Sequence, residues 1–316
     1  MTDRPTPLFS VVLVIREDDE NKHLNNAVQS VWRQRVEAIE MIVADEGASD
    51  RLQDRIRQLE RRSPMPVHVV RTGGIGPARA RNAAAKASNG RYLAFLDVDD
   101  EYHAERLDTF RRAALVCGAF SWGFSGVDAI DQQGRSVDVG VIPDSALRAS
   151  IHISRRPVDA IVNLPVAFTP VSGGNLVVDA DLFHELAGFR ELEQLSDWDL
   201  ALRLLRRSAP VTFERLLYRR RVRVPGGAGT SAIGATAAER AAVLDDYRLG
   251  LVQDRLAGRS SDGVRPYSVA RPLDPDERVV VAVALRGLDW LRKVPRAYAA
   301  MRQVARWLRR AESRFR

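Results

Sequence analysis

The chain has 316 residues, of which 45% are hydrophobic and 28% are charged, a balance that is typical of a globular protein with a sizeable core. It contains no run of about 18 uncharged apolar residues, and its first residues lack the apolar stretch of a signal peptide, so neither a spanning helix nor a leader is expected. A single cysteine, Cys117, excludes a disulfide within the chain and favours a cytoplasmic location.

The formal net charge of +7 is concentrated near the C-terminal end. Residues 286–316 contain ten Arg or Lys and two acids, so the rest of the chain is close to neutral and nucleic-acid binding is not expected. Apolar residues recur there at three- and four-residue steps, which predicts a basic amphipathic helix. Peripheral contact with the inner face of a membrane, docking on the rest of the chain and pairing with a second subunit all stay open for it.

Strand and helix patterns alternate over the first 118 residues. They imply a Rossmann-like, mostly parallel α/β sheet with helices on both faces, in which ligands bind beyond the carboxyl ends of the strands. The acids of the segments ADEGASD and DVDDEY fall at that edge. Strands are predicted over 9–15, 40–46, 66–72 and 91–100, and helices over 24–35, 52–62, 77–87 and 103–118.

The pattern is looser after residue 118, and 144–170 has no clear assignment. A Ser-x-x-Asp signature predicts a capped helix that begins at Ser196, with Asp199 serving its first turn. We further expect a hairpin at Gln133-Gly134, a turn, strand and helix within 172–188, one or two strands within 210–224, a flexible joint over 225–234, and helix after 236 except for 258–275.

The glycines of GGIGPARARN, residues 73–82, do not complete a dinucleotide fingerprint, because Arg79 stands where the third glycine would be. The segment instead predicts a turn into a helix. Arg79 and Arg81 fall in its first turns, where a helix start and guanidinium groups suit an anion such as a diphosphate. A solvated helix face is the alternative for either arginine.

Three carboxylates, those of Asp97, Asp99 and Asp100, follow the fourth predicted strand. Alternation places Asp97 and Asp99 on one face of an extended chain, where their charges repel. A divalent cation would relieve this repulsion, because Mg²⁺ and Mn²⁺ prefer carboxylate oxygens and keep positions for phosphate oxygens. The segment therefore predicts a metal site that carries a diphosphate, with helix capping as the alternative for Asp100.

These motifs follow one another in a characteristic order: ADEGASD, GPARARN, YLAFLDVDDEY and, much later, SDWDLALRL. Through them the sequence resembles the inverting family 2 glycosyltransferases of the GT-A fold, over roughly residues 9–225. The resemblance implies metal-assisted transfer of a sugar from a nucleoside-diphosphate sugar, most readily a UDP-sugar, to an unidentified acceptor in the bacterial cytoplasm. The implied units are 1–118, the nucleotide-sugar-binding half; 119–235, the acceptor-binding and catalytic-base half of the same domain; and 236–316, a helical basic extension.

The resemblance also implies roles for individual residues. Asp197 is the expected general base, with complementation of a helix dipole as its alternative. The expected donor-binding residues are Val14, Arg16, Asp45, Glu46, Arg81, Asp97 and Asp99. Gly173, Gly174 and Trp198 are expected on the acceptor side, and Asp97, Asp99 and Asp100 at the Mn²⁺ or Mg²⁺ ion.

Several positions depart from the family pattern. Residues 14–17 replace a Pro-x-Tyr-Asn opening, Glu46 replaces an Asp, and Ser196 replaces the first acid of a Glu-Asp pair. Residues 219–221, all arginine, occupy the area of a metal-approaching His, and they could hold phosphate directly and reduce the reliance on a metal.

Two other functions stay open beside the transferase. One is a sugar-phosphate nucleotidyltransferase, although the acidic segment IREDDENK stands where that class needs a Gly-rich, Lys-bearing loop. The other is a degenerate scaffold that binds nucleotide sugars or a membrane surface without catalysis.

Overall fold

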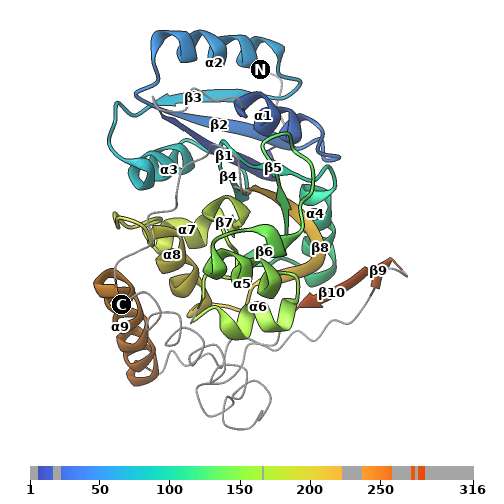
Figure 1. Ribbon diagram of the computed structural model, residues 1–316. Helices are drawn as coiled ribbons and strands as arrows, with labels where there is room; N and C mark the ends of the chain where they lie inside the picture. The colour runs from blue at the N-terminus through green and yellow to red at the C-terminus, as the bar shows by residue number, and fades with distance from the viewer. Residues whose placement is uncertain are drawn as a thin grey trace.

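The computed structural model describes residues 6–16, 23–165, 167–222, 237–257, 272–274 and 277–281. Its strands are β1 Phe9–Arg16, β2 Ile39–Glu46, β3 Val67–Arg71, β4 Tyr92–Leu96, β5 Glu101–Tyr102, β6 Trp122–Ile130, β7 Val177–Asp179, β8 Val211–Arg221, β9 Pro272–Asp274 and β10 Glu277–Val281. They form one sheet of order β3-β2-β1-β4-β7-β6-β8-β10-β9, with β5 paired to β8 (Figure 1).

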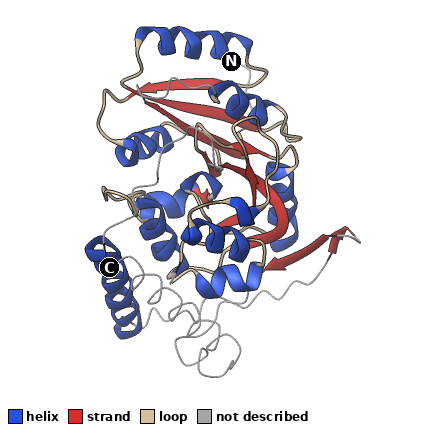
Figure 2. Ribbon diagram, viewed as in Figure 1, coloured by secondary structure: helices blue, strands red, loops and turns tan. Residues whose placement is uncertain are grey.

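The helices cover both faces of this sheet (Figure 2). They are α1 Leu24–Trp32, α2 Asp50–Arg62, α3 Pro77–Lys86, α4 Arg106–Cys117, α5 Ser145–Ser154, α6 Pro157–Asn163, α7 Ala180–Glu185, α8 Ser196–Leu205 and α9 Ala237–Leu256, with 3-10 turns η1 Val139–Val141 and η2 Gly173–Asn175. Helices α1 and α4 contribute to one core cluster, and α3, α7 and α8 to the other. The sheet therefore separates two hydrophobic cores.

Strand β1 illustrates why these segments fold as they do. Its β-branched run favours a strand, and successive side chains point to opposite faces. Val11 and Leu13 accordingly pack in one core cluster and Val12 in the other. Such burial on both faces is typical of a parallel strand between two helical layers.

Helix α1 shows the matching helical pattern. Leu24, Ala27, Val28 and Val31 are its buried apolar residues, and their spacing of three and four places them on one stripe facing the sheet.

The pairing of β1 positions the functional edge. Strand β1 runs parallel to β2 and to β4, and Leu13 lies beside Leu96 at the end of β4. Asp97 therefore leaves the sheet next to Val14. The neighbouring strand β2 ends level with β1, with Asp45 beside Ile15.

The predicted order of elements in the first half is confirmed, with ends that differ by a few residues. The unassigned segment 144–170 contains α5 and α6, and the expected hairpin is a tight turn closed by a bridge between Ile130 and Ser136.

Two local predictions in the second half are wrong. Helix α8 begins at Ser196 with Asp199 in its first turn, as predicted, but its N-cap residue is Leu195, which makes no side-chain cap, so the Ser-x-x-Asp signature does not form a capping box. Asp199 instead accepts from Arg203 Nε at 2.8 Å, because a buried guanidinium one turn later is the stronger partner. Residues 277–281, expected to be helical, form β10 antiparallel to β8. The reason is that the β-branched valines of the run ERVVV favour a strand.

The predicted joint at 225–234 and the basic helix within 286–316 lie outside the described residues. Among the helices that are described, none combines the length and the apolar character needed to cross a membrane.

Candidate functional site

Residues from five separate parts of the chain converge beyond the carboxyl end of β4. Arg81 comes from α3, Asp97 directly follows β4, Gly173 begins η2, Asp197 lies in the first turn of α8, and Arg220 is near the end of β8. The cluster therefore joins both halves of the sheet at the edge where the sequence predicts a ligand site.

Arg81 connects two of the carboxylates. Its Nη2 donates to Asp97 Oδ1 at 2.9 Å, and its Nη1 lies 3.5 Å from Asp197 Oδ1. The guanidinium also lies over the Phe189 ring, 5.4 Å from the ring centroid. Arg81 is thus held in one orientation between the two acids.

Asp197 is the acid that the sequence analysis predicts as the general base. Gly173 donates its backbone N–H to Asp197 Oδ2 at 3.0 Å, and the side chain is 23% exposed. Burial raises the pKa of Asp197 above its ordinary value, although the nearby Arg81 opposes this shift, and the charge of Asp97 adds to it. A fixed carboxylate with a raised pKa is suited to accept a proton from a bound hydroxyl.

Asp97 has a different electrostatic environment. Burial alone would raise its pKa, but Arg81 and Arg220 together hold the pKa of Asp97 below its ordinary value. Ser172 Oγ donates to Asp97 Oδ2, and Arg220 Nη1 lies 3.4 Å from the same oxygen. Asp97 therefore stays ionised, with both carboxylate oxygens engaged.

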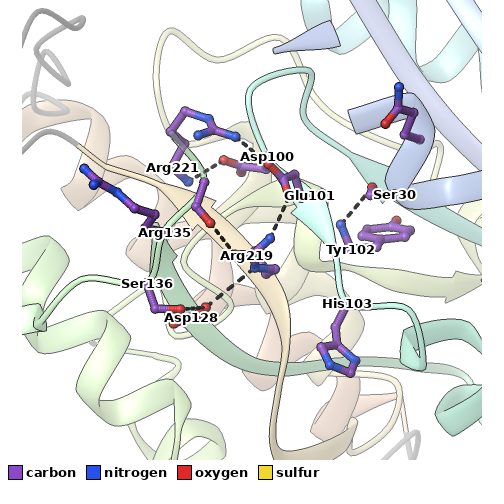
Figure 3. Close-up of polar contacts among 12 residues, drawn as sticks. Ser30, Asp100, Glu101, Tyr102, His103, Asp128, Arg135, Ser136, Arg219 and Arg221 are labelled. Atoms are coloured by element: carbon purple, nitrogen blue, oxygen red, sulfur yellow. Dashed lines mark hydrogen bonds and ion pairs between the residues drawn. The ribbon is translucent and has the colours of Figure 1, made fainter. Parts of the chain in front are cut away.

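Asp100 is fully buried and faces β8. Its Oδ2 accepts from Tyr218 Oη at 2.6 Å and from Arg220 Nη1 at 2.8 Å, and its Oδ1 accepts from the backbone N–H of Arg221 at 2.9 Å. Burial is the main cause of a raised pKa for Asp100. The Arg221 contact is visible in Figure 3.

Asp99, the first choice for a metal ligand, is exposed. Its backbone carbonyl accepts from Arg221 Nε at 2.8 Å. Within the described residues, no three side chains of His, Cys, Asp or Glu are placed to hold a metal ion together. The predicted three-carboxylate site of Asp97, Asp99 and Asp100 is therefore not formed there, because Asp97 and Asp100 are turned to arginines.

Strands β1 and β2, which carry predicted donor-binding residues, end side by side. The pairing places Arg16 beside Glu46, with Arg16 exposed and Val14 half-buried. Glu46 Oε1 accepts from the backbone N–H of Gly76, whereas its buried Oε2 has no hydrogen-bond partner among the described residues. Glu46 Oε2 is thus an enclosed acceptor at this end of the sheet.

Asp45, the acid that precedes Glu46 in β2, shapes a turn. Its Oδ1 accepts from the backbone N–H of Ala48 at 2.8 Å. The next residue but one, Gly47, has φ +78°, a left-handed conformation that glycine adopts without steric cost. Asp45 thus supports the loop after β2 while lying at the functional edge.

The two glycines expected on the acceptor side are buried against the cluster. A Cβ on Gly173 would lie 2.6 Å from both Asp197 carboxylate oxygens. A Cβ on Gly174 would lie 2.6 Å from the backbone nitrogen of Asp97 and would also collide with Tyr218 Oη. The turn therefore needs both glycines to approach the acids.

Trp198, also expected on the acceptor side, lies in the core. It is 2% exposed, and its Nε1 donates to the backbone oxygen of Leu164 at 2.7 Å. The acceptor-contact prediction is wrong for this structure, because the helical turn that presents Asp197 to the site directs Trp198 inward.

Three further residues at this edge, Ser172, Tyr218 and Asn82, were not predicted from the sequence. Asn82 forms a pair of hydrogen bonds with the backbone of Phe189, from Nδ2 to oxygen at 2.8 Å and from the Phe189 N–H to Oδ1 at 2.9 Å. The GPARARN motif contained this signal, since an asparagine next to Arg81 offers both a donor and an acceptor.

The comparisons with known proteins agree with this architecture. A family model described as glycosyl transferase family 2 matches residues 10–119. The putative teichuronic acid biosynthesis glycosyltransferase TuaG of Bacillus subtilis is 30% identical over 133 residues, 42% of this chain and 51% of that protein. The Escherichia coli protein WfgD, a UDP-Glc:alpha-D-GlcNAc-diphosphoundecaprenol beta-1,3-glucosyltransferase, is 29% identical over 100 residues, 32% of this chain and 39% of that protein.

A solved structure supports the fold over a longer range. TarS residues 1–349 of S. aureus in complex with UDP-GlcNAc superpose with a TM-score of 0.56 at 18% identity, covering 77% of this chain and 66% of that one. The GT-A-type α/β fold is thereby confirmed. The matches to the first curated relatives span 31%, 33% and 51% of their lengths.

Proposed function

We propose, from the match of residues 10–119 to the family model described as glycosyl transferase family 2 and from the related glycosyltransferases, that the chain transfers a sugar from a nucleoside-diphosphate sugar to an acceptor, with inversion at the anomeric carbon. The observation that carries the proposal is the contact of Arg81 with both Asp97, at 2.9 Å, and Asp197, at 3.5 Å. It brings the expected donor side and the expected base within reach of one substrate.

The proposed reaction is a single displacement. Asp197 takes the proton from the acceptor nucleophile as that atom forms a bond to the anomeric carbon. The bond between this carbon and the diphosphate oxygen breaks, and its electron pair stays on the leaving diphosphate. Arg81 stabilises the charge that develops there, because its guanidinium is fixed before the reaction. Attack opposite the leaving group inverts the configuration.

We propose a UDP-sugar as the donor. Glu46 ends β2 at the functional edge, and a carboxylate at that place can accept from the N–H of a uracil base. The name of WfgD includes UDP-Glc, and the matching TarS structure holds UDP-GlcNAc. Asp45, Val14 and Arg16 are assigned to the same nucleoside side because they lie at the ends of the paired strands.

Asp97, Asp99 and Asp100 do not form a common set of ligands, within the described residues, for the Mn²⁺ or Mg²⁺ ion expected from the family resemblance. The oxygens of Asp97 and Asp100 are engaged by Arg81, Arg220, Ser172 and Tyr218 and by the Arg221 backbone, and Asp99 is exposed. No step of the proposed reaction is therefore assigned to a metal.

The test uses the full chain with UDP-Glc and UDP-GlcNAc, and water as acceptor. Proton NMR should detect a free sugar whose first-formed anomer is inverted relative to the donor. Asp197→Asn should lower turnover by about 10²–10⁴-fold with unchanged UDP affinity, since only proton acceptance is lost. Asp159→Asn, an exposed acid of α6, is the matched control and should turn over like wild type.

Two results would contradict the proposal. A first-formed sugar of retained configuration would exclude the single displacement. Failure to bind UDP, GDP and dTDP in calorimetric titrations would exclude a nucleotide-sugar transferase and favour the scaffold alternative.

A further inference from the structure

Arg220 occupies the space between two carboxylates of the DVDD segment. Its Nη1 lies 2.8 Å from Asp100 Oδ2 and 3.4 Å from Asp97 Oδ2. Asp100 raises the pKa of Arg220, and an arginine is in any case protonated throughout the physiological range. A permanent positive charge from the chain itself therefore stands where the sequence predicts a metal ion.

The guanidinium of Arg220 is not saturated by these contacts. Its Nε is buried without a hydrogen-bond partner among the described residues, and its Nη2 makes no hydrogen bond with the described part of the chain. The side chain is 32% exposed, so a ligand can approach it. Because Nε is buried and Nη1 is engaged, Nη2 is the group that can donate to a phosphate oxygen.

The two neighbouring arginines are committed elsewhere. Arg219 pairs with Glu101 at 2.7 Å (Figure 3). It also donates to the Gly134 carbonyl at 2.6 Å. Arg221 pairs with Glu101 at 2.6 Å and donates to the carbonyls of Asp99 and Asp131. Of this run of three arginines, Arg220 is thus the one that faces the acids with donors to spare.

The inner cluster contains two cations of its own. The carboxylates of Asp97, Asp100 and Asp197 face the guanidinium groups of Arg81 and Arg220, so two of the three negative charges are matched without a divalent ion. A metal entering between these acids would have to displace Arg220 and would meet its charge at close range. A diphosphate oxygen, in contrast, can accept from Nη2 of Arg220 with the present contacts in place.

We propose that Arg220 replaces the divalent cation in this site and, together with Arg81, binds the donor diphosphate directly. Donor binding would then not require Mg²⁺ or Mn²⁺. The inference rests on the proposed function, because it names the group that holds the diphosphate of that donor.

The experiment is a calorimetric titration of the full chain with UDP, in Mn²⁺ and in EDTA. Wild type should bind UDP equally in both. Arg220→Gln should bind UDP about tenfold or more weakly in EDTA. Mn²⁺ should restore its binding, because removing the guanidinium leaves Asp97 and Asp100 free to hold a metal. Arg220→Lys keeps a positive charge and should stay independent of metal.

Arg219→Gln is the matched control. It removes the same charge from the neighbouring residue, whose side chain is paired to Glu101. It should bind UDP like wild type in EDTA. Electron paramagnetic resonance with Mn²⁺ alone gives a second reading: Arg220→Gln should bind the ion more tightly than wild type does.

The outcomes separate the inference from the function on which it rests. If the wild-type protein binds UDP only when Mn²⁺ is present, the inference is overturned and the transferase proposal is left intact. This measurement needs no variant, so it does not depend on whether a variant folds. Wild-type affinity of Arg220→Gln in EDTA also overturns it. No binding of UDP, GDP or dTDP under either condition overturns the proposed function itself.

Discussion

The backbone N–H of Gly173 donates to Asp197 Oδ2 at 3.0 Å, and the same glycine leaves no room for a side chain. A Cβ at this position would lie 2.5 Å from Asp197 Cγ. The orientation of the proposed base therefore depends on a residue 24 positions earlier in the chain.

Gly173→Ala should displace the Asp197 carboxylate and lower kcat by about 10²-fold, because a shift of about 1 Å in a catalytic group has an effect of this order. UDP affinity, measured by calorimetry, should be unchanged, since Gly173 touches the base rather than Asp97. Gly140→Ala, at an exposed glycine of η1, is the control. An unchanged kcat for Gly173→Ala would show that Asp197 does not act from this position.

The pH dependence of kcat/KM should report the pKa of Asp197. The base works ionised, so activity falls as the pH drops through that pKa; this fall is the acid limb of the pH profile. Burial raises the pKa of Asp197, so the acid limb should lie above the ordinary range for an aspartate. Arg81 opposes the shift, so Arg81→Gln should move the acid limb to higher pH in addition to weakening donor binding.

Arg79→Gln is the control for this profile, because Arg79 lies on the same helix but pairs with Glu191 and is 57% exposed. Its acid limb should coincide with that of wild type. A limb that moves to lower pH in Arg81→Gln would contradict the assignment of Asp197 as the base.

Trp198→Phe should affect stability rather than substrate binding. The change removes the donor to the buried Leu164 carbonyl and leaves a small cavity, so the free energy of unfolding should fall by about 2–4 kcal/mol in urea denaturation. Trp32→Phe is a matched control, because Trp32 Nε1 has no hydrogen-bond partner among the described residues. UDP affinity should be unchanged in both variants, and a selective loss in Trp198→Phe would return this residue to the site.

Asn82→Asp should weaken donor binding through Arg81. The carboxylate cannot donate to the Phe189 carbonyl, so the ring that lies against the Arg81 guanidinium should shift. We expect a loss of about 1–3 kcal/mol in unfolding free energy and a raised KM for the donor. Asn25→Asp, at an exposed position of α1, should change neither quantity. An unaltered KM in Asn82→Asp would limit Asn82 to a structural role.

Local patterns in the sequence identified several members of the site. Arg81 was expected from a helix start that contains arginines, and Asp197 from the order of the motifs. Both lie in the cluster that the structure forms. Trp198 was misplaced because the sequence does not say which side of the first turn of α8 faces the core.

Arg220 shows where a local pattern is insufficient. Alternation along a strand predicts that Arg220 and its two neighbours point to opposite faces, but it does not predict which face meets the acids. That choice depends on the pairing of β5 with β8, which places Tyr102 beside Tyr218, and on a register shift near Gly126 where β6 pairs with β8.

The sequence by itself determined the alternation of strands and helices, the GT-A-type resemblance and the edge of the sheet at which the acids collect, because hydrophobic periodicity and strand ends are local properties. Only the tertiary structure decided that Asp97 and Asp100 meet arginines rather than one another. Arg81 lies 16 positions before Asp97, but Arg220 lies 123 positions after Asp97 and 120 after Asp100. Contacts of that separation are set by strand register and by the burial of charge, neither of which a single segment specifies.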